Sequence, residues 1–122
     1  MTSPEAAKRP RPALLRIVLY AEAARWSAYA LECDLRTSAN TADAALDTLI
    51  KIVETHVAAD LRTGREPLSI FKVTPQRIWN KFATAANVKH PVQLRRPEAP
   101  GRLSYLIATC ADDAEASAPA LN

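Results

Sequence analysis

The chain has 122 residues and a formal net charge of +3, with 48% hydrophobic and 24% charged residues. This length and composition fit one small globular domain with short tails and exclude a sizeable second domain. Only two glycines occur, which excludes a glycine-rich phosphate loop, and we expect neither a signal peptide nor a membrane span.

The two ends of the chain differ in composition from the part between them. Residues 1–12 are rich in proline, alanine and charge, and residues 111–122 are acidic and rich in alanine and serine. Such segments bury too little apolar surface to fold, so we expect disordered tails. The folded body should span residues 13–110 as a single α+β domain, with a C-terminal extension over about 87–110.

The first half of the body reads as strands followed by a long helix. Residues 14–22 alternate branched apolar side chains on both faces, and residues 26–35 supply a second strand, so the two predict an antiparallel hairpin. A third short strand over 35–39 should end at Asn40, placed in the left-handed region as a sharp turn. Thr41 predicts an N-cap, and apolar residues at helical spacing predict a helix from about Ala42 to the residues before Gly64.

The second half is interrupted by prolines. Residues 68–73 predict a strand, and Thr74 as N-cap with Pro75 as the first helical residue predicts a second helix that buries Trp79. The four breakers within residues 87–101 predict irregular structure, and residues 103–110 a possible last strand. The expected architecture is an antiparallel sheet, β-β-β-α-β, followed by a short second helix and that last strand, with the helices on one face. Because residues 14–20 are apolar on both sides, the opposite face needs a cover, either the second helix or another subunit.

The stretch from Trp26 to Val57 resembles the HicB-like antitoxin family. The resemblance is carried by an aromatic-x-alanine strand, an acidic-hydrophobic strand end, a turn before threonine and an alanine- and leucine-rich helix. In this sequence these are Trp26-Ser27-Ala28, Leu31-Glu32-Cys33-Asp34-Leu35, Ala39-Asn40-Thr41 and Ala44 through Leu49. Residues 68–82 are also similar to a segment of a compact subgroup, and Asn40 departs from the family's usual glycine.

The resemblance implies a partial RNase H-like domain, usually a homo-oligomer, that binds a small ribonuclease toxin called HicA and blocks its RNA site. Many such antitoxins add a C-terminal DNA-binding module, but the prolines after residue 87 leave no place for two successive helices. The resemblance therefore predicts a non-enzymatic, cytoplasmic partner-binding protein without a cofactor. A stand-alone nucleic-acid-binding regulator is the alternative, and a minor RNase H-like enzyme is a third hypothesis.

Three residues near the predicted strand end are candidates for partner binding: Glu32, Asp34 and Arg36. Glu32 and Asp34 alternate along the predicted strand and should point to one side, as metal-binding carboxylates do. The plainer interpretation is a solvated strand end. Toxin contact by these residues is the second interpretation, and catalysis the third.

The positive charge lies in one part of the chain, because residues 62–110 contain nine Lys/Arg against two acids. A solvated basic surface is the plain interpretation, with nucleic-acid backbone contact and docking to an acidic protein as alternatives. The candidates for contact with DNA or RNA are Arg77, Lys81, Lys89, Arg95, Arg96 and Arg102.

Neither histidine nor cysteine indicates catalysis or a metal site. His56 and His90 have no serine, cysteine or acid at a recognisable partner spacing. Cys33 and Cys110 lie in separate apolar runs, which predicts buried thiols in a reducing compartment. We therefore expect no metal ion.

Overall fold

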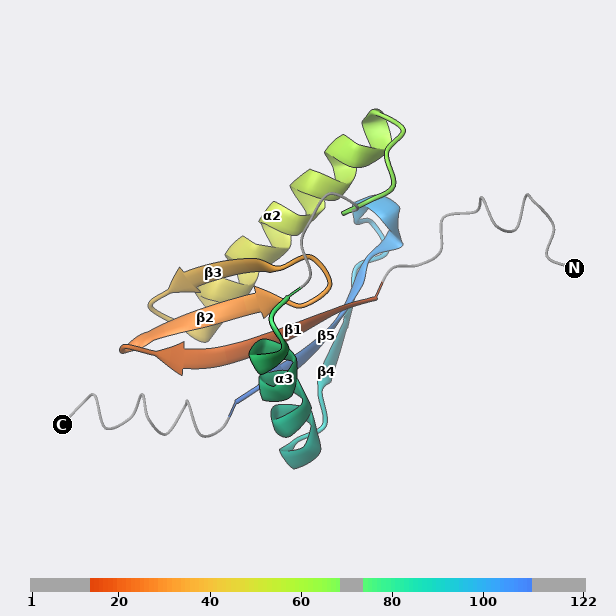
Figure 1. Cartoon of the computed structure of the whole chain (residues 1–122). Helices are drawn as coiled ribbons and strands as arrows, with labels where there is room; N and C mark the ends of the chain where they lie inside the picture. Colours follow the sequence, from red (N-terminus) through yellow and green to blue (C-terminus); the bar gives the residue numbers. More distant parts are fainter. Residues whose placement is uncertain (1–13, 69–73, 111–122) are drawn as a thin grey trace, which may run out of the picture.

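The computed structural model describes residues 14–68 and 74–110, which form an α+β arrangement of one mixed five-stranded sheet and two helices (Figure 1). The predicted tails, and the predicted strand over 68–73 apart from Leu68, lie outside the described residues. The strand order across the sheet is β3-β2-β1-β5-β4. In chain order the elements are β1 (Leu14–Glu22), β2 (Arg25–Ala30), β3 (Leu35–Ala39), α2 (Ala42–Arg62), α3 (Gln76–Val88), β4 (Val92–Arg95), the 3-10 turn η1 (Pro100–Arg102) and β5 (Ser104–Thr109).

The sheet is mixed, so the prediction of purely antiparallel pairing was wrong. β1 pairs with β2, β2 with β3 and β4 with β5 in antiparallel fashion, but β5 lies parallel to β1, with Leu14 opposite Ser104. Parallel neighbours require a long crossover connection. The segment from α2 to β4 provides it, and it returns the chain to the end of the sheet where β1 begins.

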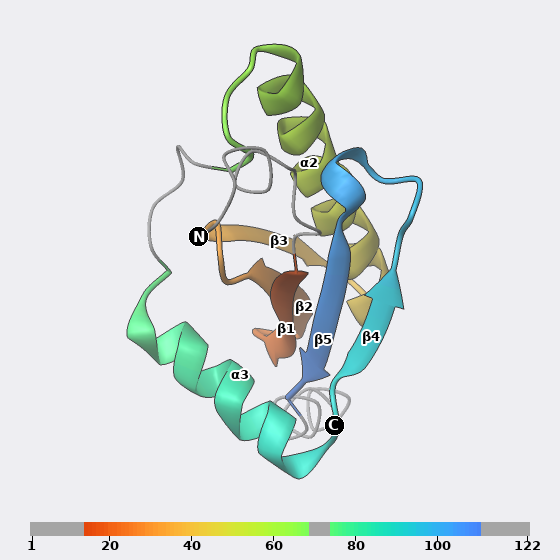
Figure 2. The ribbon, with the colours of Figure 1, turned by 90° about the vertical axis from the view of Figure 1, so that its right-hand side faces the viewer.

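The two helices cover opposite faces of the sheet (Figure 2). Of the two covers expected for the second face, the second helix is the one observed, and the arrangement with both helices on one face is not. Leu15, Ile17 and Leu19 of β1 pack in the cluster that α2 closes. Val18 and Tyr20 pack in the second cluster, with Ile78, Phe82 and Ala85 of α3. The apolar residues on both sides of β1 are the physical reason, because each side must be removed from water.

The second predicted strand ends earlier than expected. β2 stops at Ala30, and residues 31–34 form a turn in which Asp34 has a positive φ of 52°. The backbone N–H of Leu31 donates to the carbonyl of Arg16 at 2.9 Å, which holds this turn against β1. Glu32 and Asp34 therefore belong to a turn and do not alternate along a strand. The third strand is confirmed at Leu35–Ala39.

The junction between β3 and α2 differs from the prediction at one residue. Asn40 does not have the positive φ of a left-handed turn, and its Oδ1 accepts a hydrogen bond from Arg25 Nη1 at 3.3 Å. A left-handed turn is unnecessary because the extended Thr41, at φ −129° and ψ 157°, leads directly into the helix. The Thr41 cap is confirmed, since its hydroxyl accepts from the Ala44 N–H at 3.1 Å. The bounds of α2, Ala42–Arg62, also agree with the prediction.

The start of α3 is fixed by a contact to the sheet. Thr74 makes no cap; its buried hydroxyl donates to the carbonyl of Leu31 at 2.6 Å, and Pro75 occupies the cap position. The predicted cap was therefore wrong by one residue. The consequence is that the first turn of α3 is attached to the same 31–34 turn that carries Glu32 and Asp34.

The proline-rich stretch contains regular structure, contrary to the prediction for residues 87–101. β4 runs over Val92–Arg95 and η1 over Pro100–Arg102. Pro91 and Pro97 flank β4 and do not interrupt it, and β4 is an edge strand that needs hydrogen bonds on one side only. Residues 87–110 thus supply two of the five strands.

Candidate interaction surfaces

Glu32 and Asp34 are both engaged by neighbouring side chains. Glu32 accepts from the Arg16 guanidinium at 2.6 Å and from the Arg16 backbone N–H at 2.7 Å. Asp34 accepts a hydrogen bond from the Tyr29 hydroxyl. These contacts hold the 31–34 turn onto β1 and β2. These contacts give both acids a structural role, which supports their interpretation as a strand-end feature over that as a catalytic pair.

Arg36 is the most available of the three predicted partner-binding residues. Its guanidinium lies 3.8 Å from Glu22, and the two side chains are 54% and 60% exposed. Exposed ion pairs of this kind contribute little to stability because water screens them. Arg36 can therefore be substituted with little effect on the fold.

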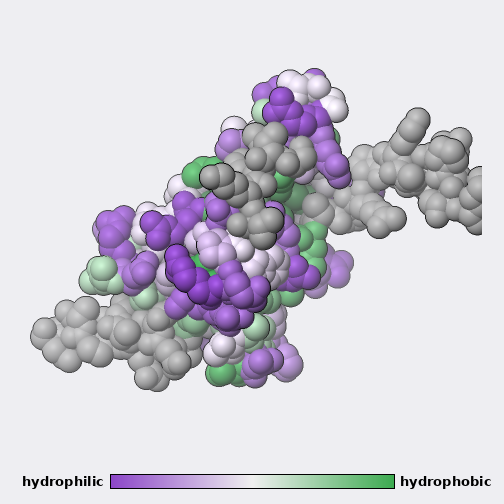
Figure 3. Space-filling model, viewed as in Figure 1, coloured by the Kyte–Doolittle hydropathy of each residue, from purple (hydrophilic) through white to green (hydrophobic). Residues whose placement is uncertain are grey.

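Side chains from several elements meet on the side of the sheet that α3 covers. The Arg16 guanidinium carbon lies 5.6 Å from the centre of the Trp79 ring, and Lys81 Nζ lies 4.8 Å from the centre of the Tyr20 ring. Trp79 also packs against the α3 core, as predicted. Figure 3 shows largely hydrophilic residues over this side. We call it the α3 surface, and its members are Arg16, Glu32, Asp34, Arg36, Arg77, Trp79 and Lys81.

The α3 surface contains all three predicted partner residues and two of the predicted nucleic-acid residues. Arg36 stands opposite Tyr29 in the β2–β3 ladder. The positive charge of Arg77 on α3 lowers the pKa of the Tyr29 hydroxyl, against the larger upward effects of burial and of Asp34. Residues predicted to bind a protein partner and residues predicted to bind nucleic acid thus lie on one surface.

The remaining predicted nucleic-acid residues lie elsewhere. Lys89 caps the C-terminal end of α3, whereas Arg95, Arg96 and Arg102 line one hollow beside β4 and η1. The predicted nucleic-acid residues are therefore distributed over α3, β4 and η1.

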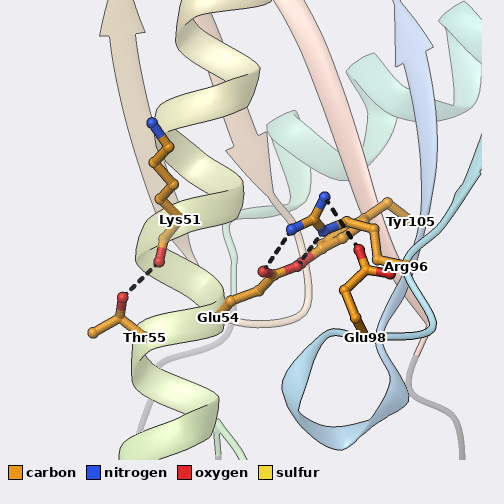
Figure 4. A network of polar contacts seen from close by, with 6 residues as sticks. All are labelled: Lys51, Glu54, Thr55, Arg96, Glu98 and Tyr105. Carbon is orange, nitrogen blue, oxygen red and sulfur yellow. Dashed lines mark hydrogen bonds and ion pairs between the residues drawn. The ribbon is translucent and has the colours of Figure 1, made fainter.

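A polar network that the sequence does not reveal connects Glu54 of α2 with Tyr105 of β5 and with Arg96, which follows β4 (Figure 4). Arg96 donates from Nε and Nη2 to the Glu54 carboxylate at 2.6 Å and 3.0 Å, and the Tyr105 hydroxyl donates to the same carboxylate at 3.0 Å. Burial and the Glu54 carboxylate raise the pKa of Tyr105 well above its ordinary value. The hydrogen bond to Glu54 likewise raises the pKa of Arg96. No spacing in the sequence pairs Glu54 with Arg96 or Tyr105.

Reactive side chains do not converge in the described part of the chain. Within residues 14–68 and 74–110, no three His, Cys, Asp or Glu side chains gather as metal ligands. Burial raises the pKa of the Cys33 thiol to about 11, and both cysteines are buried. No helix among these residues is long and apolar enough to cross a membrane.

No family model, no curated protein and no solved structure matches this chain.

The Tyr29–Asp34 contact predicts a pH-dependent stability. Burial first, and then the Asp34 carboxylate, raise the pKa of Tyr29 from 10.0 to about 12. Because this pKa is raised in the folded state, the protonated Tyr29 hydroxyl contributes its full stabilisation of the fold below pH 10. This contribution is lost as the pH rises through about 12. We expect the free energy of unfolding of Tyr29→Phe to fall less steeply over that range than that of the parent. Chemical denaturation at a series of pH values measures it, and parallel profiles would contradict the assignment.

Proposed function

We propose that this chain is a HicB-like antitoxin, or a protein derived from one, with a partial RNase H-like domain. It acts without catalysis of its own, by binding a small ribonuclease of the HicA type and blocking the RNA site of that enzyme. The observation that carries the proposal is the α3 surface, where Glu32, Asp34 and the exposed Arg36 of the resembling stretch lie beside the second helix.

The succession of elements supports this proposal. The hairpin, the third strand and the long α2 occupy the part of the chain that carries the resemblance, with β3, Thr41 and α2 at the predicted residues. The position of Asn40 lends no support, because it does not take the turn conformation that the resemblance implies. The proposal therefore depends on the order of elements and on the surface that they present.

The chemistry of the α3 surface also supports binding of a protein partner. It presents both signs of charge around a partly buried tryptophan, and Arg16 and Glu32 hold each other in fixed positions. Aromatic and arginine side chains dominate the binding energy of protein interfaces.

The direct test is co-expression of this chain with the small basic protein encoded by the adjacent reading frame. The proposal predicts growth rescue and a complex that co-purifies. Persistent toxicity, or elution of the two proteins separately, would show the proposal to be wrong.

Arg36→Glu is expected to weaken that complex without unfolding the protein. The substitution reverses one exposed charge at the edge of the α3 surface, so we expect roughly a tenfold or greater loss of affinity, the order typical of an interface arginine. Arg62→Glu is the matched control because Arg62 is exposed at the end of α2. Isothermal titration with the purified partner measures both, and equal affinities for the two variants would remove Arg36 from the interface.

Self-association in the cytoplasm is part of the same proposal. β3 and β4 are the outer strands, and each has one edge that pairs with no other described strand. Free edges can add a strand from another chain. Sedimentation equilibrium of the purified full chain tests for a dimer or larger assembly.

A further inference from the structure

A hollow of about 450 Å³ lies where the end of β4 meets η1 and the start of β5. It falls in the size range of small-ligand sites. Five polar residues line it, Arg95, Arg96, Arg102, Gln93 and Ser104, together with the buried Leu103.

The three arginines of the hollow differ in their electrostatic surroundings. Arg96 is engaged by Glu54 at 2.6 Å and lies 3.9 Å from Glu98, so two carboxylates offset its charge. Arg95 and Arg102 are exposed, and neither forms an ion pair with an acid in residues 14–68 or 74–110. The hollow therefore presents two guanidinium groups whose charge no acid among the described residues offsets by an ion pair.

The backbone of Arg102 has a conformation that residues other than glycine rarely adopt. Its φ is 57°, directly after Gly101 at φ 70°. The Arg102 N–H donates to the Ala99 carbonyl at 3.1 Å, and a Cβ on Gly101 would lie 3.2 Å from Val57 of α2. η1 therefore packs closely on α2 directly next to the strained residue. Strain of this kind is found most often at functional sites.

The neutral polar groups of the hollow project from the same side of the sheet as Arg95. Gln93 and Arg95 are two residues apart on β4, and Arg95 stands opposite Ser104 in the β4–β5 ladder. Guanidinium, amide and hydroxyl groups are the donors that proteins use for phosphate oxygens. The buried Leu103 adds an apolar wall, which strengthens charged hydrogen bonds by excluding water.

From this arrangement we propose that the hollow binds a phosphate group of single-stranded nucleic acid. Arg95 and Arg102 contact the phosphate oxygens, Gln93 and Ser104 donate to the same group, and Arg96 is a fixed wall. The space exceeds that of one phosphate, so an adjoining nucleotide can lie against an arginine plane. This site uses none of the residues of the α3 surface, although Gln93 lies on the same face of the sheet as Arg16, two strands away.

The test is binding of a labelled single-stranded RNA oligonucleotide, followed by fluorescence anisotropy over a range of salt concentrations. The double variant Arg95→Gln with Arg102→Gln should bind roughly tenfold more weakly for each arginine lost. Its slope of log affinity against log salt should fall by about 1.4, since each phosphate contact on a single strand contributes about 0.7. The matched control is Lys51→Gln with Arg62→Gln, which removes the same charge from exposed positions of α2.

A second variant separates binding from folding. Arg102→Gly removes the guanidinium and also relieves the positive φ, so it should unfold at the same or a higher temperature and still bind RNA more weakly. The site assignment fails if the parent does not bind RNA at low salt, or if both double variants match in affinity and slope. Inorganic phosphate is the competing source of the same chemistry. Calorimetric binding of phosphate as tight as that of RNA would overturn the nucleic-acid assignment.

Discussion

Replacing Glu54 by alanine is expected to lower the free energy of unfolding by about 2–3 kcal/mol, the largest effect of any single substitution considered for this chain. The Glu54 side chain is only 14% exposed and accepts from both Arg96 and Tyr105. Its removal leaves the hydroxyl of Tyr105, a fully buried residue, without its acceptor, and it leaves Arg96 without its nearest carboxylate. An unpaired buried polar group bears its full desolvation cost, which exceeds the net value of the hydrogen bond.

The control for this prediction is Glu98→Ala. Glu98 also approaches Arg96, at 3.9 Å, but its side chain is 72% exposed, so its loss should change the stability by less than about 0.5 kcal/mol. Tyr105→Phe in the Glu54→Ala background should recover part of the loss, because it removes the unpaired hydroxyl. Urea denaturation followed by circular dichroism measures all three variants. A Glu54→Ala protein as stable as Glu98→Ala would mean that the network contributes nothing to the fold.

Local patterns predicted the elements whose determinants are close in sequence. The Thr41 cap and the apolar spacing of α2 fix both ends of that helix within the segment itself. The apolar residues on both sides of β1 indicated a second covering layer and named α3 as one candidate for it. Both predictions depend on apolar side chains that recur every two to four residues, a pattern that is visible in a single sequence.

The rest depends on residues far apart in the chain. The parallel pairing of β1 with β5 joins segments about 90 residues apart, as Leu14 and Ser104 illustrate, and no local pattern distinguishes it from antiparallel pairing. Asp60 resembled a solvated helix residue but is 5% exposed, and it accepts from the backbone N–H of Leu68 at 2.8 Å. Glu54 likewise has its partners far away, 42 and 51 residues along the chain. A charged residue on a helix reveals its partner only once the fold has placed that partner.

The candidate sites divide in the same way. Glu32, Asp34 and Arg36 were identified from a short stretch, and they do lie together, but the Arg16–Glu32 and Tyr29–Asp34 contacts could not be inferred from spacing. The six basic candidates are grouped only by composition, and the fold distributes them over α3, its C-terminal cap, the end of β4 and η1. Charge counted along a chain therefore gives the sign of a surface and not its location.

The tip of the β1–β2 hairpin is expected to be the site where stability can be gained most easily. Glu22 pairs with Arg25, so Ala23 and Ala24 form a two-residue loop, and their φ values are 53° and 64°. Two positive φ values in succession are those of a type I′ turn, which asparagine followed by glycine adopts best. An alanine Cβ in this region meets the neighbouring backbone, at a cost of about 1–2 kcal/mol per residue. No turn signal is visible here in the sequence, because neither alanine is a turn former.

The double substitution Ala23→Asn with Ala24→Gly should raise the free energy of unfolding by about 1–2 kcal/mol, after allowance for the greater freedom of glycine in the unfolded chain. Asn40→Gly is the informative control, because glycine is the residue that the family resemblance expects at that turn. Since Asn40 has no positive φ, glycine there relieves no strain, and it removes the side chain that accepts from Arg25. We expect Asn40→Gly to leave the stability unchanged or slightly lower. Thermal and urea unfolding of both proteins decide the matter: a gain at Asn40 equal to that at the hairpin would mean that the left-handed strain lies at the β3–α2 junction.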